Sequence, residues 1–177
     1  MDVILGIDPG TTMGWAVGQI AAPYCLLSHG SRRLMAPKGD DTHPGERYRR
    51  ALVMLESVVI PCDHVHLVAY ELPHASGRLA AQYHYGIIAV CQMFAAQVGA
   101  ECIGVHSATL KKHATGNGHA EKDQMVAAAY RARLVPKDHV FASHDEADAI
   151  WIMDYARCIY RRNNPASRQP AGARARA

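Results

Sequence analysis

Four acidic residues stand where their carboxylates could take part in one chemical step. Asp8 and Glu71 each end an apolar segment, as residues at the end of a buried strand do. Asp145 and Asp148 are three positions apart, so on a helix they face the same way. Taken alone, each acid is also explained as a turn former or a helix cap, although Glu is a poor turn former. If the two strands are parallel neighbours, Asp8 and Glu71 share one edge of a sheet, and all four carboxylates can converge there if the helix packs across the strand ends.

Converging carboxylates need cations, because like charges a few ångströms apart repel each other. Oxygen ligands favour hard divalent cations, so Mg²⁺ is the expected ion and Mn²⁺ the expected substitute. Two such ions, roughly 3.5–4 Å apart, would bridge a phosphate, activate water and stabilise the leaving oxygen. The acids therefore predict hydrolysis of a phosphodiester bond.

Hydrophobic patterning indicates the elements that would position these acids. Apolar runs predict strands over residues 2–7, 13–20, 24–34, 65–70 and 101–105. Apolar residues at helical spacing predict helices over about 44–60, 79–98, 107–113, 120–134 and 145–160. Short links between the first three strands indicate an antiparallel meander. The predicted fold class is α/β, with a mixed five-stranded sheet of three antiparallel and then two parallel strands, flanked by helices.

Composition and charge divide the chain into two parts. With 177 residues, 49% of them hydrophobic and 20% charged, the sequence suits one globular domain, predicted over 1–160. Residues 161–177 carry five arginines and no acid, which predicts a basic disordered tail. Such a tail either attracts DNA phosphates in a salt-sensitive way or only keeps the protein in solution.

Other sequence features exclude several classes of protein. No apolar run approaches the roughly 20 residues of a membrane span and no signal pattern opens the chain, so no membrane partner and a cytoplasmic location are expected. Five cysteines without a C-x-x-C pair are expected to be reduced. We expect neither a zinc site nor a disulfide framework, and we interpret most of the eleven histidines as surface or hydrogen-bonded residues.

Three blocks of residues stand out together. They are Gly6-Ile-Asp-Pro-Gly-Thr-Thr12-x-Gly14-Trp15, a strand ending in Glu71, and Lys111-Lys-x-x-x-Gly116-Asn-Gly118-His-Ala-Glu-Lys122 followed by Asp145-Glu-Ala-Asp148-Ala. In order and spacing they resemble the RuvC family of Holliday-junction resolvases. The resemblance extends from about residue 2 to 157. It implies the RNase H-like fold and, in a bacterial or phage-infected cell, a crossover junction endodeoxyribonuclease with two Mg²⁺ ions per active site.

The resemblance also implies roles for individual residues. The implied metal ligands and catalytic residues are Asp8, Glu71, Asp145 and Asp148, and Lys122 is an additional catalytic residue that contacts the scissile phosphate. The implied DNA-binding residues are Lys111, Lys112, Lys122, His74 and Arg78. His74 stands where the family often has an aromatic wedge, and its loop resembles divergent phage members. His144 could replace Asp145, because both can share a helical face with Asp148, but the register of the motif favours Asp145.

The function implied is the resolution of four-way DNA junctions by paired, symmetric nicks that leave 5′-phosphate and 3′-hydroxyl ends. A homodimer is implied too, and the helix over 79–98 is the candidate interface because Tyr83, Tyr85 and Ile88 add apolar surface beyond one stripe. A relaxed nuclease for forks, flaps or RNA is the alternative on the same fold. The complete set of four acids argues against a non-catalytic protein that only binds junctions. A sugar-kinase or Hsp70-like ATP-binding module also contains the motif G-I-D-x-G-T-T, but such proteins need two lobes and this chain is expected to hold one.

Overall fold

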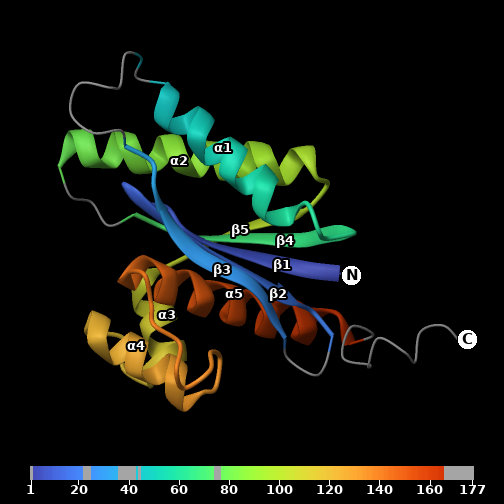
Figure 1. The fold of residues 1–177 in the computed structure, drawn as a ribbon, viewed down its shortest axis with the longest axis vertical. Coiled ribbons are helices and arrows are strands. Elements are labelled where there is room, and N and C mark those ends of the chain that lie inside the picture. Colours follow the sequence, from blue (N-terminus) through green and yellow to red (C-terminus); the bar gives the residue numbers. More distant parts are fainter. Residues whose placement is uncertain (1, 22–24, 36–42, 44, 74–76, 166–177) are drawn as a thin grey trace, which may run out of the picture.

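The computed structural model describes residues 2–21, 25–35, 43, 45–73 and 77–165 (Figure 1). His74 and residues 166–177, most of the predicted basic tail, lie outside the described residues. The boundary predicted at residue 160 falls inside a helix that continues to Asn163. Arg161 and Arg162 stand in the last turn of this helix, where positive charge is favoured by the helix dipole.

A single five-stranded sheet forms the middle of the molecule. Its strands are β1 (Asp2–Asp8), β2 (Thr12–Gln19), β3 (Leu26–Arg33), β4 (His64–Glu71) and β5 (Glu101–Val105). Their order in space is β3-β2-β1-β4-β5. β2 pairs antiparallel with both β1 and β3, whereas β4 pairs parallel with both β1 and β5. The predicted mixed sheet is confirmed.

Helices cover both faces of the sheet. They are α1 (Glu46–Val59), α2 (Arg78–Gln97), α3 (Ser107–Thr115), α4 (Lys122–Arg131) and α5 (His144–Asn163). Figure 1 shows α1 and α2 on one face and α5 on the other, with α3 and α4 beyond α5. Helix α4 ends three residues earlier than predicted, because Arg133 adopts a positive φ of 56°. None of the helices in the described part of the chain has the length and apolar character needed to cross a bilayer.

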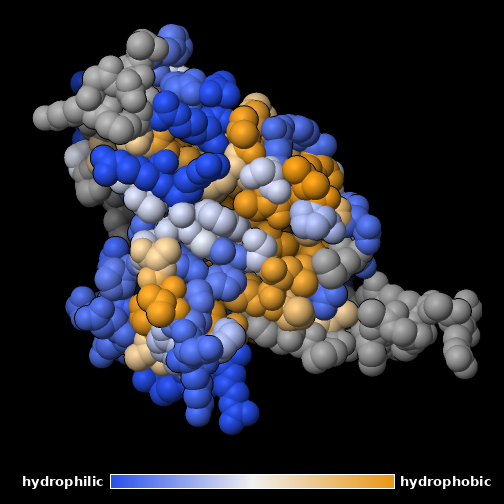
Figure 2. Space-filling view, in the orientation of Figure 1, coloured by the Kyte–Doolittle hydropathy of each residue, from blue (hydrophilic) through white to orange (hydrophobic). Residues whose placement is uncertain are grey.

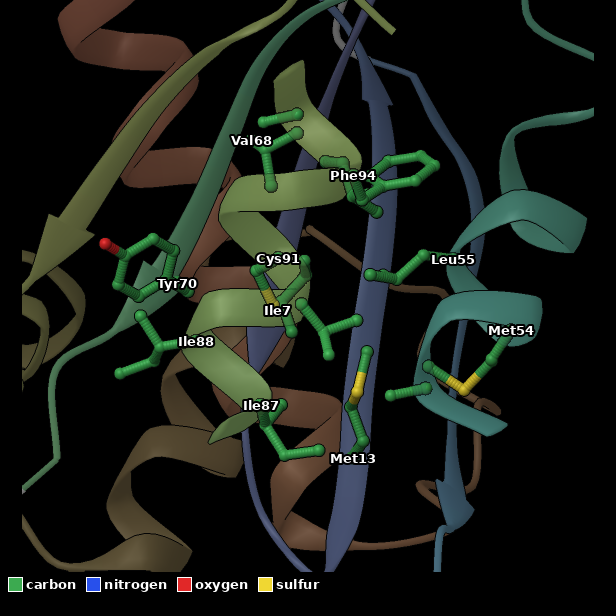
Figure 3. Packing of buried hydrophobic residues seen from close by; sticks show 14 of the residues in the cluster. Ile7, Met13, Met54, Leu55, Val68, Tyr70, Ile87, Ile88, Cys91 and Phe94 are labelled. Carbon is green, nitrogen blue, oxygen red and sulfur yellow. The ribbon is translucent and has the colours of Figure 1, made fainter. Parts of the chain in front are cut away.

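A hydrophobic core fills the space between the sheet and helices α1 and α2. Ile7 and Met13 from β1 and β2 meet Leu55 from α1 and Phe94 from α2, and all four are fully buried (Figure 3). A second cluster joins the opposite face of the sheet to α3, α4 and α5. Burial on both faces explains why the central strands are continuously apolar.

The interface residues predicted on α2 need correction. Tyr83 and Ile88 are each only 6% exposed and pack within this chain, so they supply no surface to a second copy. Their side chains face the core because α2 buries a wide stripe against β4 and α1. Tyr85 is 61% exposed, and Met93 on the same helix is 52% exposed.

Candidate active site

The four acids line one cleft of about 410 Å³. Asp8 and Glu71 are the last residues of β1 and β4, which pair in parallel with Ile7 opposite Tyr70. Asp145 and Asp148 come from the start of α5. In Figure 1 these strand ends and the start of α5 lie together at the left of the molecule. The predicted convergence of acids that are distant in sequence is present in the structure; the cleft they line is called the acidic cleft below.

Glycines in the sheet let α5 approach closely enough to bring its acids to this edge. A Cβ atom added to Gly14 would collide with the backbone carbonyl oxygen of Asp145. One added to Gly6 would collide with the backbone nitrogen of Met153, two turns further along α5. Because neither collision involves a movable side chain end, only glycine permits this packing. The close contact of α5 with β1 and β2 therefore fixes the position of Asp145 relative to Asp8.

Electrostatics couples the acids of the cleft. Burial raises the pKa of Asp8 well above its usual range, and the charges of Glu71, Asp148 and Asp145 raise it further. Burial and then the charge of Glu71 raise the pKa of Asp148 to about 6. In both cases Lys122 acts in the opposite direction, as a nearby positive charge does. The protein alone leaves this cleft short of positive charge.

This donor set fits hard divalent cations. Among the residues that the structure describes, those lining the acidic cleft offer carboxylate oxygens and one imidazole, without the thiol or paired imidazole ligands that softer metals prefer. Within the described residues, no three of the four acids form a group whose ligand oxygens all lie within 4.8 Å of one another. Side chains would therefore have to move for one ion to contact three of the acids, and bound cations would supply the missing positive charge.

Two lysines enter the acidic cleft. Lys122 opens α4, where Glu121 and Gln124 form a reciprocal capping box, and Lys111 comes from α3. Each of these two lysines, predicted to contact DNA, therefore lines the cleft with the acids. Lys112 and Arg78 are exposed on α3 and α2 and are not among the lining residues. His74 is outside the described residues.

The structure distinguishes Asp145 from His144. Asp145 lines the acidic cleft, whereas Nε2 of His144 lies 3.1 Å from Oδ1 of Asp123 on α4. His144 is not a lining residue, although its charge would lower the pKa of Asp148. The role of Asp145 as a metal ligand in place of His144 stays a prediction.

The sequence did not indicate some residues of the cleft. His84 lines it from α2, and Thr11, Thr12 and Ser107 complete its polar wall. The hydroxyl of Tyr83 donates a hydrogen bond of 3.0 Å to the carbonyl of Gly10, which ties α2 to the loop after Asp8. The helical spacing of α2 alone does not reveal that its first turns pass over the ends of β1 and β4.

The sheet order, with helices on both faces, defines an α/β protein with an RNase H-like fold. No protein-family model matches the sequence, and no curated protein matches it either.

Solved structures do match. RuvC from Thermus thermophilus superposes with a TM-score of 0.71 and 22% sequence identity, over 95% of this chain and 99% of that one. T. thermophilus RuvC in complex with a Holliday junction substrate gives a TM-score of 0.72 and 22% identity, over 93% and 97% of the two chains. The chain therefore has the fold of RuvC over nearly its whole length.

Proposed function

We propose that this protein is a metal-dependent endonuclease that resolves four-way DNA junctions. One observation carries the proposal: acids from β1, β4 and α5 line a single cleft, in a chain with the fold of RuvC. One of the two RuvC structures described above is a complex with a Holliday junction substrate. The products would be paired nicks with 5′-phosphate and 3′-hydroxyl ends.

The four acids are proposed as the catalytic metal ligands. Two Mg²⁺ ions, or Mn²⁺ in their place, would activate water and stabilise the leaving oxygen. The protein contributes geometry to this chemistry, because Asp8 and Glu71 are fixed by strand pairing and α5 is fixed by its packing on Gly6 and Gly14. A preorganised arrangement of this kind needs little rearrangement when the phosphate enters.

Lys122 and Lys111 are proposed to hold the phosphate in the cleft. Both line it, and the positive charge of Lys122 is close enough to lower the pKa of both Asp8 and Asp148. A lysine ammonium binds phosphate as a compact point charge, so its action depends on distance more than on angle. Lys122 would contact the scissile phosphate, and Lys111 would contact the strand beside it.

Positive side chains outside the cleft suggest the path of the DNA. Arg32 and Arg33 are exposed at the end of β3, and Arg49 is exposed near the start of α1. Strongly hydrophilic residues gather over this part of the molecule in Figure 2. Phosphate contacts of this kind provide affinity without sequence information. Lys112, Arg78 and, in the loop after Glu71, His74 are proposed as further DNA contacts.

A homodimer is proposed through the exposed face of α2. Tyr85, Ala89, Met93 and Ala96 are all exposed and follow one another at spacings of four and three residues. That spacing places them on one side of the helix, where they form an apolar stripe on the surface of this chain. A two-fold axis at this stripe would give two clefts for the two equivalent strands of a junction.

A cleavage assay tests the proposed function. The purified chain is incubated with Mg²⁺ and a labelled four-way junction, fork, flap, linear duplex or RNA–DNA hybrid. The proposal expects paired nicks in the junction and no comparable cleavage of the duplex. Equal cleavage of forks and flaps would support a relaxed nuclease instead. ATP binding without cleavage of any substrate would overturn the proposal.

A further inference from the structure

A second group of ligand-type side chains lies outside the acidic cleft. His29 from β3, His139 from the segment between α4 and α5, and Glu146 from α5 bring their ligand atoms within 4.8 Å of one another. None of the three lines the acidic cleft. We refer to them as the His-His-Glu cluster. Because its members come from three separate segments, the cluster exists only in the folded chain.

Glu146 is the centre of the cluster. It is only 3% exposed, so its carboxylate needs partners. Its Oε2 accepts a hydrogen bond of 2.7 Å from the backbone N–H of Ala142. Its Oε1 lies 2.6 Å from Nδ1 of His29 and 3.2 Å from Nε2 of His139. One carboxylate oxygen is thus anchored to the backbone, and the other faces two imidazole nitrogens.

The surroundings hold the two imidazoles in place. The hydroxyl of Tyr130 donates to the backbone carbonyl of His139, and the ring of Phe141 packs edge-on against the His139 ring at 4.7 Å. The His29 ring meets the His139 ring edge-on, with centroids 4.8 Å apart. The side chains of His29 and His139 remain 21% and 20% exposed, so an ion could reach them from solvent.

We propose that the His-His-Glu cluster binds a divalent transition-metal cation of the zinc class. Two imidazole nitrogens and one carboxylate oxygen are a ligand set that Zn²⁺ accepts, with a water in the fourth tetrahedral position. Ion binding would replace the two hydrogen bonds of Oε1, and each imidazole would carry its proton on the nitrogen away from the metal. The backbone contact of Oε2 would orient the carboxylate as an outer-shell partner does.

The proposed ion would join three parts of the fold. It would link the edge strand β3 and residue 139 to the first turns of α5, the helix that carries Asp145 and Asp148. The site is therefore assigned a positioning role, separate from the proposed hydrolysis. It also differs in chemistry from the acidic cleft, whose described lining residues include four acids and a single imidazole, a set that suits Mg²⁺.

A second group with metal ligands provides a matched control. His113 on α3 lies 2.9 Å from Asp154 on α5, and Cys158 is close to both. Burial and the charge of Asp154 raise the pKa of the Cys158 thiol, which disfavours the thiolate that zinc prefers. His113→Gln therefore removes an imidazole from a comparable cluster without touching the proposed site.

The test measures zinc bound by the full chain. Chelator-treated protein is given Zn²⁺ in the presence of excess Mg²⁺, desalted, and analysed for metal by mass spectrometry. We expect one zinc per chain in the wild type and in His113→Gln. His29→Gln and His139→Gln should lower the zinc affinity by more than about a hundredfold, since loss of an outer-shell partner alone costs about 10–100-fold. Zinc should raise the melting temperature of the first two proteins only.

Substitution by Co²⁺ gives an independent readout. The wild type should show the visible absorption of tetrahedral Co²⁺, and His29→Gln should lose it. This comparison decides the question even if His139→Gln does not fold, because His29 lies on an edge strand and its folding can be checked by circular dichroism. Equal zinc uptake by wild type and His29→Gln, or loss of zinc in His113→Gln or Asp8→Asn, would overturn the proposal.

Discussion

At the scale of single residues, the acidic cleft is a balance between four acids and Lys122. Burial and mutual repulsion both favour protonated carboxyl groups at Asp8 and Asp148, and Lys122 opposes them only in part. The protein therefore holds these groups in an arrangement that is unfavourable without a further positive charge. Acids whose pKa values are raised together in a cleft are typical of functional sites.

The role of Asp8 is tested by Asp8→Asn. We expect cleavage to fall by at least about 10²-fold, the range lost when one preorganised electrostatic group is removed. Junction binding should be nearly unchanged or slightly stronger, because the substitution removes a negative charge and leaves the exposed arginines intact. Cleavage is measured with a labelled junction, and binding by gel shift in Ca²⁺ buffer. An equal loss of binding and cleavage would contradict this separation of roles.

The raised pKa of Asp148 predicts how stability depends on pH. An unfolded Asp titrates near about 3.9, whereas folded Asp148 titrates at about 6. The folded state therefore binds this proton more tightly, and the stabilisation present at low pH is lost as pH rises through about 6. In metal-free protein we expect the unfolding free energy of the wild type, relative to Asp148→Asn, to fall by about 2 kcal/mol between pH 4 and pH 7. One pKa unit corresponds to about 1.4 kcal/mol, and water in the cleft screens part of this effect.

Urea denaturation at a series of pH values measures this difference. Because Mg²⁺ competes with protons for the same carboxylates, it should stabilise the wild type more at pH 8 than at pH 5. The Asp148→Asn protein provides the control for titrating groups outside the acidic cleft; inside it, the substitution also removes a charge that raises the pKa of Asp8. A wild-type stability that rises from pH 4 to pH 7 relative to the variant would show that the sign is wrong.

At the scale of elements, the fold depends on how closely α5 lies on the sheet. Gly6 and Gly14 are in neighbouring strands, and at each of them the closest atoms to an added Cβ would be backbone atoms of α5. Gly18, also on β2, meets the flexible side chain of Met153 instead. These positions allow two substitutions of identical size to be compared in one strand.

We expect Gly14→Ala to destabilise the protein by about 3 kcal/mol, because the added methyl group must displace the backbone of α5. Gly18→Ala should cost less than half of that, since the Met153 side chain can change its rotamer. Urea denaturation measures both. The Gly14 variant should also lose Mg²⁺ affinity, because Asp145 moves with the helix. Equal costs for the two variants would contradict the backbone contact.

How much of the structure could be predicted from the sequence differs from one element to the next. Apolar runs located every strand, and acids at the ends of two runs located the cleft, because both signals are local in sequence. The His-His-Glu cluster escaped prediction, since His29, His139 and Glu146 share no spacing and meet only after β3 packs near α5. The burial of Tyr83 was missed for a similar reason: helical periodicity gives the faces of α2 but not the width of the face that the core covers.

At the scale of the whole molecule, the proposed cutting of both equivalent strands of a four-way junction would use two active sites in a fixed relation. The described part of the chain forms one acidic cleft, so a second copy placed by a two-fold axis would supply the other. The exposed stripe of α2 suits this purpose, because α2 also carries His84 at the cleft and Tyr83 at the loop after Asp8. A dimer formed through α2 would therefore be connected directly to the geometry of both clefts.

The last prediction concerns this dimer and uses the double substitution Tyr85→Glu and Met93→Glu. Charges introduced on the exposed stripe of α2 would be buried without partners in the proposed dimer, so we expect the wild type to form a dimer and the double variant to be a monomer at the same concentration. Light scattering after gel filtration measures the mass. On a junction the monomer should give single nicks in place of paired ones, while Mg²⁺ stabilisation is unchanged because the cleft is intact.

Val140→Glu is the matched control, since Val140 is 85% exposed and lies far along the chain from α2. This variant should remain dimeric and should cut both strands in one encounter. The time course of cleavage of a supercoiled plasmid that carries a cruciform separates the two outcomes. Paired nicks convert the plasmid directly to linear product, whereas with single nicks the open circle accumulates first. If the α2 double variant stays dimeric and still yields linear product directly, the interface lies elsewhere on the molecule and the stripe on α2 has no part in junction resolution.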